Sequence, residues 1–495
     1  MRWICAFLAC AFVTSHLGAA QKPNVLLICV DDLKPILGCY GDKTVKSPNI
    51  DRLAGRGMVF ESAYCNQAVC SPSRNALLTS LRSQTLGIYD LATNFRKSRP
   101  DAITLPQYFK NHGYRTEGLG KIFHVGHGNQ EDPQSWSVPH FSAKSIGYAL
   151  DANKATQTRE GALFENMNPA NLPKGAAYEK ADVPDDAYGD GKLAQEAVRR
   201  LQQAAQKPSE PFFLAVGFLK PHLPFCAPKK YWDLYDPKAF QLATLKEPPQ
   251  GAPAFAPQFG GELRNYKDMP AKGAIPEDEQ RNLIHGYHAA VSYMDAQLGK
   301  VLDALDDTGL SKNTIIVLWG DHGWHLGDHG MWCKHTNYEQ ATRIPLVFVA
   351  PGLAKANART FSMVESVDIY PSLAELAGLP LPKNVEGTSV VPILKDPSAK
   401  TKEYILHVYP RGEGLGRAVR TSTHRLVEWR KVDAPAGTAV FELYDYKKDP
   451  EETKNLAGEQ PKTVEQLREI LKKQPEPKAQ IQSGNNTKKG KKAKG

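Results

Sequence analysis

The chain has 495 residues, of which 41% are hydrophobic and 23% charged, values that are ordinary for a globular enzyme with one large and one smaller domain. Of the formal net charge of +9, six units come from Arg2 and from five lysines at 488–494, which leaves +3 for the folded body. Because no basic face interleaved with aromatic residues is present, we expect no nucleic-acid partner. The cysteines are too sparse for a disulfide framework, and no CxxC pair indicates zinc.

Residues 1–20 have the composition of an export signal. Arg2 provides a positive start, residues 3–13 are almost all apolar, and Gly18-Ala19-Ala20 offers small residues for cleavage. The apolar run is shorter than the roughly 20 residues that a spanning helix requires, and no later run is long enough. We therefore predict an exported protein, periplasmic or secreted, without a transmembrane segment. An uncleaved anchor and a lipid-modified Cys10 are the alternatives.

The body of the chain alternates between strands and helices. Residues 24–30 form a continuous apolar run, which is typical of a strand buried on both faces of a parallel sheet. Further strands are predicted at 212–216 and 314–319, and helices at 104–112, 192–206, 278–307 (one helix or two) and 365–378. This alternation predicts a layered α/β fold. The intervening segment 128–190 is rich in Asn, Asp, Gly and Pro, and is predicted to form loops that serve a binding site.

A proline-rich connection at 380–392 marks a domain boundary. Beyond it, short strands are predicted at 404–409, 417–420, 425–429 and 439–444, with a helix at 462–473. This order indicates a small antiparallel sheet with a helix packed on it. The predicted organisation is a signal at 1–20, a catalytic domain at 21–385, a C-terminal subdomain at 386–473 and a disordered Lys-rich tail at 474–495. The alternative for the tail is contact with an anionic surface or polysaccharide.

Polar residues follow the three predicted strands and the segment 115–119, which we take as a fourth strand. They are Asp31 and Asp32, Lys121 and His124, Lys220 and His222, and Asp321 and His322. Ligands of open parallel sheets bind beyond the carboxyl ends of the strands, so we expect these side chains to converge on one edge. For each residue alone, a loop position without a functional role is the alternative.

Three of these side chains suit a hard cation such as calcium or magnesium, because such ions prefer oxygen ligands. Asp31 and Asp32 are adjacent at a buried strand end, where two carboxylates would repel each other without a cation. Asp321 would supply a third carboxylate. The alternatives are that the aspartates cap the following segment and that His322 has a structural role.

The pentapeptide Cys70-Ser71-Pro72-Ser73-Arg74 begins a predicted helix, since proline is favoured in a first helical turn. Cys70 is therefore expected near the positive end of a helix, where backbone N–H groups favour an anion. By position alone, Cys70 is either a nucleophilic thiol of low pKa or a buried apolar residue.

Together with Leu77-Leu78-Thr79, this pentapeptide resembles the signature of the sulfatase family, which belongs to the alkaline-phosphatase-like superfamily. The resemblance runs from Asn24 to about Ala457 and is greatest to the iduronate-2-sulfatase group. The motifs that carry it are Val30-Asp31-Asp32-Leu33, Leu37-Gly38-Cys39-Tyr40-Gly41-Asp42, Ser47-Pro48-Asn49-Ile50-Asp51, Gly120-Lys121-Ile122-Phe123-His124, Lys220-Pro221-His222-Leu223-Pro224-Phe225 and Asp321-His322-Gly323-Trp324. The resemblance implies an α/β/α sandwich with a large, mostly parallel sheet and a smaller C-terminal subdomain.

The resemblance also implies a site and a substrate class. Cys70 would be converted to formylglycine by a maturation enzyme, and one Ca²⁺, with Mg²⁺ as the alternative, would be bound. The implied metal ligands are Asp31, Asp32, Cys70, Asp321 and His322, and the implied residues around the sulfate are Arg74, Lys121, His124, His222 and Lys334. The substrate would be a sulfated sugar or polysaccharide, with a 2-O-sulfated uronic acid at a chain end as the leading candidate.

The implied mechanism is attack on sulfur by the hydrated aldehyde at position 70. His222 is the candidate acid for the departing sugar oxygen and His124 the candidate base that expels sulfate, and these two roles could be exchanged. Lys121 and Lys334 would offset charge on the sulfate oxygens.

Two positions depart from the pattern of the family. Ser80 replaces the usual closing glycine, for which we expect altered helix packing, and His325 replaces a small apolar residue, which bears on sugar specificity. Arg411 could face a second anionic group of the substrate or form a surface salt bridge. Two other functions remain open: a phosphatase or phosphonate-ester hydrolase of the same superfamily, and a non-catalytic protein that binds sulfated glycans.

Overall fold

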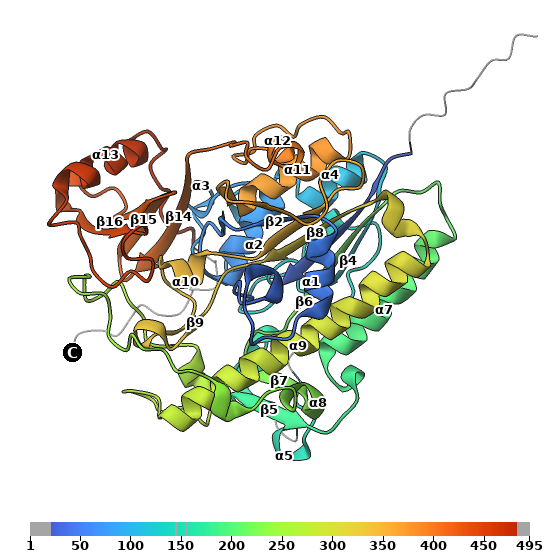
Figure 1. Cartoon of the computed structure of the whole chain (residues 1–495), viewed down its shortest axis with the longest axis horizontal. Coiled ribbons are helices and arrows are strands. Elements are labelled where there is room, and N and C mark those ends of the chain that lie inside the picture. The colour runs from blue at the N-terminus through green and yellow to red at the C-terminus, as the bar shows by residue number, and fades with distance from the viewer. Residues whose placement is uncertain (1–20, 144–146, 155–156, 483–495) are drawn as a thin grey trace, which may run out of the picture.

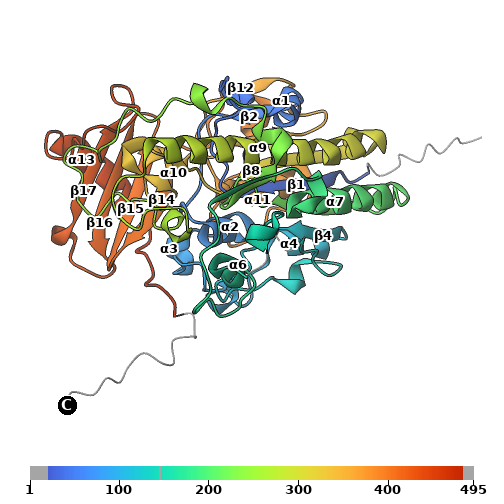
Figure 2. The ribbon, with the colours of Figure 1, turned by 90° about the horizontal axis from the view of Figure 1, so that it is seen from below.

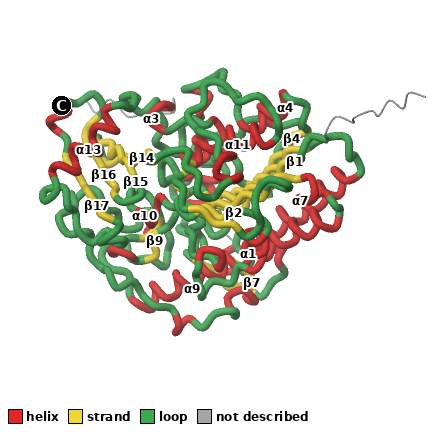
Figure 3. Tube along the Cα trace, turned by 45° about the horizontal axis from the view of Figure 1, so that its top comes forward, coloured by secondary structure: helices red, strands yellow, loops and turns green. Residues whose placement is uncertain are grey.

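The computed structural model describes residues 21–143, 147–154 and 157–482 (Figure 1). The predicted export signal at 1–20 and residues 483–495 of the predicted tail lie outside the described residues. A seven-stranded sheet crosses the middle of the molecule (Figure 3). The strand order is β12 (Ala358–Thr360), β2 (Met58–Phe60), β11 (Leu346–Val349), β8 (Thr314–Gly320), β1 (Asn24–Val30), β6 (Phe212–Phe218) and β4 (Arg115–Gly120).

The sheet is mostly parallel, as predicted. Strand β1 pairs in parallel with β6 and β8, β4 pairs in parallel with β6, and β12 pairs in parallel with β2. Only β11 runs antiparallel to its two neighbours, β2 and β8. The carboxyl ends of β1, β4, β6 and β8 therefore meet at one edge, which is the edge that carries the polar residues.

Every residue of β1 is buried, because the strand is covered on both faces. Successive side chains of a strand point to opposite faces. Leu26 and Ile28 accordingly pack with one set of helices, and Val25 and Leu27 pack with another. The first set is α1 (Pro48–Gly55), α7 (Gly189–Ala205) and α9 (Glu277–Asp307), and the second is α2 (Cys70–Thr79), α4 (Leu105–Asn111), α11 (Ile369–Leu376) and α12 (Val391–Lys395). Figure 1 shows these layers, which confirm an α/β/α sandwich.

Helix α9 is a single helix of 31 residues, where the sequence left one helix or two open. Three acidic residues, 277–279, occupy its first turn and interact favourably with the positive end of the helix dipole. Its buried face, which includes Tyr287, Val291 and Leu298, covers the sheet over most of the length of the body (Figure 2).

The segment 128–190 contains more regular structure than the predicted loops. It holds the short helices α5 (Asp151–Lys154) and α6 (Arg159–Phe164) and strand β5 (Tyr178–Ala181), which pairs in parallel with β7 (Phe225–Pro228). These elements are too short to produce a clear periodic pattern. The other short elements are β3 (Ala63–Tyr64) paired with β13 (Val364–Glu365), β9 (His325–Leu326) paired with β10 (Trp332–Cys333), and the helices α3 (Ser83–Leu86), α8 (Lys229–Trp232) and α10 (Glu339–Thr342).

The C-terminal subdomain is the predicted antiparallel sheet covered by one helix. Its strands are β14 (Tyr404–Arg411), β15 (Gly414–Thr421), β16 (His424–Lys431) and β17 (Val440–Asp445), in that order, and its helix is α13 (Pro461–Lys472). Leu467 and Leu471 of α13 pack on Leu426 and Leu443 of the sheet. Ile393 and Leu394 of α12 pack in the core beside α11, so we propose that the boundary lies between α12 and β14 rather than at 385.

Residues 474–482 are packed against the body, which corrects the prediction of a disordered tail for this part of the chain. The backbone N–H of Lys478 donates to the Gln84 carbonyl over 2.9 Å, and that of Ile481 donates to the Gly87 carbonyl over 2.8 Å. Gly87 has φ +67°, and a Cβ there would lie 2.7 Å from the Ala479 carbonyl oxygen. Composition did not reveal this pairing because it depends on the backbone of a distant segment.

Among the residues that the structure describes, no helix combines the length and the apolar character needed to cross a membrane.

Candidate active site

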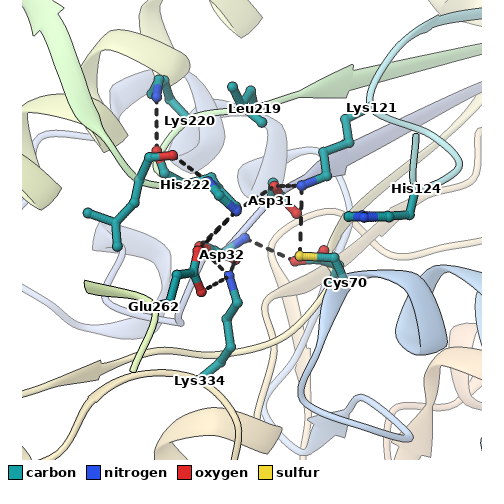
Figure 4. A network of polar contacts seen from close by, with 12 residues as sticks. Asp31, Asp32, Cys70, Lys121, His124, Leu219, Lys220, His222, Glu262 and Lys334 are labelled. Carbon is teal, nitrogen blue, oxygen red and sulfur yellow. Dashed lines mark hydrogen bonds and ion pairs between the residues drawn. The ribbon is translucent and has the colours of Figure 1, made fainter. Parts of the chain in front are cut away.

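Most of the side chains that the sequence singled out meet at the carboxyl edge of the large sheet, and Figure 4 shows Asp31, Asp32, Cys70, Lys121, His124, His222 and Lys334 among them. Asp31 and Asp32 follow β1, Lys121 and His124 follow β4, His222 follows β6, and Asp321 and His322 follow β8. Cys70 enters the same place from the first turn of α2, and Lys334 from the loop after β10. Parallel pairing causes this convergence, because all four strands end at the same edge.

Asp31 is fully buried between two cations. Arg74 Nη2 lies 2.9 Å from Asp31 Oδ1, and Lys121 Nζ contacts the other carboxylate oxygen. Burial alone would raise the pKa of Asp31, but Lys121 and Arg74 hold it well below the usual value. Asp31 is therefore ionised.

Asp32 and Asp321 are also fully buried, but their pKa values rise. Burial, opposed by Lys334 and reinforced by repulsion from Asp31, raises the pKa of Asp32 well above the usual value. Burial and repulsion from Asp31 raise that of Asp321 to about 7. The cluster therefore holds more negative charge than its own cations neutralise.

The donor set fits a divalent cation. Ligand atoms of Asp31, Cys70, Asp321 and His322 lie within 4.8 Å of one another, and so do those of Asp31, Asp32, Cys70 and His222. Each group supplies two carboxylate oxygens, the ligands that hard cations prefer, and such an ion would relieve the repulsion that raises the two pKa values. His322 Nε2 lies 3.2 Å from Asp32 and 3.5 Å from Asp321, so its side chain belongs to the cluster.

Asp32 adopts a left-handed backbone conformation, with φ +60°. This conformation is uncommon for a residue other than glycine. The Asp32 N–H donates to Asp321 Oδ1 over 3.0 Å, and the Tyr287 hydroxyl donates to the Asp32 carbonyl over 2.7 Å. These bonds stabilise the turn that places the carboxylate toward Lys334.

Cys70 is buried at the amino-terminal end of α2. Its Sγ lies 3.5 Å from His322 Nε2 and 3.7 Å from Lys121 Nζ. Burial, reinforced by Asp31, raises the pKa of the thiol well above its usual value. A cysteine nucleophile needs a lowered pKa, so the unmodified thiol is poorly suited to attack.

Arg74 forms ion pairs with Asp31 and Asp321 and is not among the residues that line the cavity beside Cys70. Its Nε lies 3.1 Å from Asp321 Oδ2, and another guanidinium nitrogen donates to the Lys121 carbonyl. Its side chain is fully buried. It therefore acts on the site by fixing Asp31 and Asp321.

Glu262 is a site residue that sequence reasoning missed. Its carboxylate lies 2.9 Å from Lys334 Nζ and 3.4 Å from His222 Nε2. Burial opposes its ionisation, but the Lys334 ammonium group holds its pKa below the usual value. Glu262 lies in an irregular segment between β7 and α9, so no strand end or motif pointed to it.

Lys334 lies between two carboxylates. Its Nζ is 2.9 Å from Asp32 Oδ1 as well as from Glu262, and it lies 4.9 Å from the centre of the Trp324 ring. The cation–π contact and the ion pairs orient the ammonium group toward the cluster.

The two candidate acid–base histidines are neutral in this state. Burial, reinforced by nearby lysines, lowers the pKa of both His124 and His222 well below the usual value. His222 Nδ1 lies 2.5 Å from the Leu223 carbonyl, to which it can only donate, so Nε2 carries the free lone pair. His124 Nε2 lies 3.2 Å from His127 Nδ1.

Lys220 follows the same strand as His222 but does not join the charged cluster. Its Nζ donates to the carbonyls of His222 over 2.9 Å and of Pro224 over 2.6 Å (Figure 4). Lys220 thus holds the backbone of the loop that carries His222.

A cavity of about 310 Å³ lies against this cluster. Cys70, His124, His222 and Lys334 are among its lining residues, whereas the three aspartates, Arg74 and Lys121 are not. The remaining wall consists of Leu91, His127, Arg159, Glu160, Leu163, Phe164, Glu262, Asn265 and His335. Most of these residues come from the segment 128–190 or from the loops near 262 and 335.

The departure at Ser80 is accommodated by hydrogen bonds. Ser80 closes α2 in the left-handed region, with φ 54° and ψ 32°, a conformation that usually favours glycine. Its hydroxyl donates to the Val367 carbonyl over 2.6 Å and accepts from the Gly387 N–H over 3.1 Å. These bonds compensate the strain without moving Cys70 away from the cluster.

His325 and Arg411 have bracing roles. His325 bonds Asp328 through Nδ1 and Thr336 through Nε2, the latter over 2.8 Å, and it does not line the cavity. Arg411 donates to the Phe255 carbonyl over 3.1 Å and to the His335 carbonyl. Arg411 is not among the lining residues of the cavity, and among the described residues it has no carboxylate within ion-pair distance. It joins two loops near the cavity, and a contact with the substrate stays a prediction.

Comparison with known proteins agrees with this geometry. The profile of the sulfatase family matches residues 23–379, and that of the N-sulphoglucosamine sulphohydrolase C-terminal region matches 327–480. The chain is 41% identical over 398 residues to iduronate 2-sulfatase of Mus musculus, covering 74% of this chain and 70% of the mouse enzyme.

Solved structures share the fold. BT4656, in complex with its substrate D-glucosamine-2-N,6-O-disulfate, is 22% identical with a TM-score of 0.72, covering 91% of this chain and 97% of BT4656. The phosphonate monoester hydrolase of Silicibacter pomeroyi is 21% identical with a TM-score of 0.72, covering 91% of this chain and 95% of the hydrolase. This fold is thus shared by a protein whose substrate is a sulfated sugar and by a phosphonate monoester hydrolase. The match to the sulfatase profile and the identity to the mouse sulfatase place this chain with the sulfatases. The chain belongs to the sulfatase family and is a sulfuric ester hydrolase.

Proposed function

We propose that this sulfatase hydrolyses sulfate esters of sulfated sugars, through a formylglycine that a maturation enzyme makes from Cys70. The observation that carries the proposal is the buried Cys70, whose raised pKa makes it a poor thiol nucleophile and which lines a cavity together with Lys334, His124 and His222. A 2-O-sulfated uronic acid at a chain end is the leading substrate, supported by the 41% identity to an iduronate 2-sulfatase.

The proposed metal is one Ca²⁺, with Mg²⁺ as the alternative. Asp31, Asp32, Asp321 and His322, together with the modified residue at position 70, would hold it. When bound, the ion supplies a Lewis acid that lowers the pKa of an oxygen nucleophile and offsets the charge of the sulfate.

The protein side chains have separable roles in this proposal. Lys334 and Lys121 offset charge on the sulfate oxygens, because both ammonium groups are buried beside position 70. Arg74 is a positioning residue that holds Asp31 and Asp321. His124 is neutral and so can accept a proton from an oxygen at position 70.

His222 is the proposed acid for the departing sugar oxygen. The resting imidazole is neutral, but Glu262 at 3.4 Å and the charge of a bound sulfate ester both favour its protonated form. The variant His222→Ala should slow esters with poor leaving groups far more than aryl sulfates, because only poor leaving groups need the proton. Equal slowing of both classes would assign the acid role elsewhere, with His124 the next candidate.

The whole proposal is tested on protein produced with a formylglycine-generating enzyme. The mass of the peptide that contains Cys70 reports the conversion, and sulfate and phosphate esters are assayed side by side on the same preparation. We expect an aldehyde at position 70 and faster turnover of the sulfate esters. A preferred phosphate or phosphonate ester would support the alternative hydrolase. An unmodified thiol without turnover would support a glycan-binding protein.

We also propose that the protein is exported to the periplasm or secreted, on the basis of the composition of residues 1–20.

A further inference from the structure

Two glutamates line the active-site cavity, and they differ in their partners. Glu262 is paired with Lys334 and His222. Glu160, from the first turn of α6, has a carboxyl oxygen, Oε1, that is buried without a hydrogen-bond partner. Among the described residues, Glu160 also forms no ion pair. Among the described residues that line the cavity, the buried polar atoms without a partner are therefore Glu160 Oε1 and His124 Nδ1, and only the first belongs to a residue to which the proposed function gives no role.

Such an arrangement costs stability. Glu160 is only 7% exposed, and a buried polar group without a partner loses the hydrogen bonds it made to water. Burial, reinforced by Glu262, raises the pKa of Glu160 to about 7, so its ionisation is unfavourable. A ligand that donates a hydrogen bond to this carboxyl group would remove the cost.

The surroundings of Glu160 restrict what that ligand group can be. Arg159 and Lys334 also line the cavity, but a second sulfate or a carboxylate at this position would be repelled by the Glu262 carboxylate and would leave Glu160 Oε1 without a donor. A hydroxyl group is neutral and supplies the missing donor. Leu163 and Phe164, which follow on the same helix, offer apolar surface to the C–H groups of a sugar ring.

We propose that Glu160 accepts a hydrogen bond from a hydroxyl group of the sugar that bears the scissile sulfate. Glu160 thereby selects sugars with a free hydroxyl at that position over sugars with a second anionic group there. This inference rests on the proposed function, because it requires a sugar sulfate in the cavity.

The test combines protein variants with altered substrates. Wild-type protein, Glu160→Leu and Glu160→Gln are assayed on 4-nitrophenyl sulfate and on a panel of defined monosaccharide sulfates. The best monosaccharide is then compared with its monodeoxy analogues, each lacking one hydroxyl. Glu165→Gln is the matched control, since Glu165 follows the same helix but is exposed and outside the cavity.

In the wild type, removal of one particular hydroxyl should lower kcat/KM by about 10- to 100-fold. In Glu160→Leu, removal of the same hydroxyl should have little further effect. Glu160→Gln, which keeps a neutral acceptor, should lie between the two. The control Glu165→Gln should behave as the wild type on every substrate.

Two kinetic outcomes would overturn the inference. If Glu160→Leu and the wild type lose the same factor on every deoxygenation, sulfatase function stands and the role of Glu160 is wrong. If no monosaccharide sulfate is hydrolysed by matured wild-type protein, the proposed function fails, and this inference fails with it. Thermal unfolding gives an independent readout, because Glu160→Leu removes an unsatisfied group and should not lower Tm, whereas a structural role would lower it.

Discussion

The carboxyl edge of the large sheet and the C-terminal sheet both bury charged side chains, but they use them differently. At the edge, Asp31, Asp32 and Asp321 crowd together and two of their pKa values rise. In the C-terminal sheet, Arg425 contacts Glu452 and donates to the Asn337 carbonyl. The first cluster is poised for a ligand, whereas the second connects two parts of the fold.

Strand direction accounts for the difference. In the parallel part of the large sheet, β1, β4, β6 and β8 deliver their following residues to one edge. In the antiparallel sheet, consecutive strands end at opposite edges, so chemistry-bearing residues are spread apart. The C-terminal sheet is nevertheless connected to the site. Arg425 of this sheet donates to the carbonyl of Asn337, which lies three residues after Lys334. We expect variants at the edge to lose activity and variants in the C-terminal sheet to lose stability.

The largest expected effect is that of Cys70→Ser. Without formylglycine, turnover of sulfate esters should fall by at least about 10⁴-fold, since the nucleophile is lost. Tm should change little, because serine fits the buried position. The control Cys39→Ser replaces a partly exposed cysteine outside the cavity and should retain activity. A large loss of stability in Cys70→Ser would contradict the expectation that variants at the edge lose activity rather than stability.

The next effect is that of Arg425→Met in the C-terminal sheet. Glu452 would remain buried without its cation, so the free energy of unfolding should fall by about 3 to 5 kcal/mol, measured by denaturant titration. On the same strand, Lys431→Met removes an exposed ion pair and should change stability by only about 0.5 kcal/mol. Equal effects of the two variants would contradict a structural role for the buried pair.

Calcium and pH are expected to change the stability of the protein through the carboxylates at the edge of the large sheet. The folded metal-free protein raises the pKa of Asp321 from its usual value to about 7, so it binds more protons than the unfolded chain between about pH 4 and 7. Stability from this group is therefore lost as the pH rises through that window. Calcium should displace the proton and restore stability.

The expected gain in Tm from calcium is about 3 °C at a 100-fold excess over Kd, and larger at pH 7.5 than at pH 5. Magnesium is tested in parallel. The variant Asp321→Asn should lose most of the response to the metal. A gain in Tm that is the same at both pH values would show that binding is not coupled to Asp321.

The smallest expected effect concerns residues 474–482. Deleting 474–495 removes the hydrogen bonds to Gln84 and Gly87 and should lower the free energy of unfolding by about 2 kcal/mol. Deleting only 483–495 is the control and should leave stability unchanged. If both truncations behave alike, the packing of 478–481 contributes nothing measurable.

The amino-acid sequence alone was enough to predict the fold class, the convergence of Asp31, Lys121, His222 and Asp321, and the special position of Cys70. It could do so because burial pattern, strand period and strand ends are local properties, and parallel topology then places those ends together. The resemblance to the sulfatase family added Lys334 to the residues expected around the sulfate.

Which side chains line the cavity became evident only from the three-dimensional packing of the chain. Glu160 and Glu262 lie in irregular or short segments, where no period predicts orientation, and Arg74 faces the aspartates rather than the cavity. Arg411 and the backbone N–H groups of Lys478 and Ile481 donate hydrogen bonds to backbone carbonyls of distant segments. Such contacts depend on how loops pack across hundreds of residues, which neither composition nor spacing records.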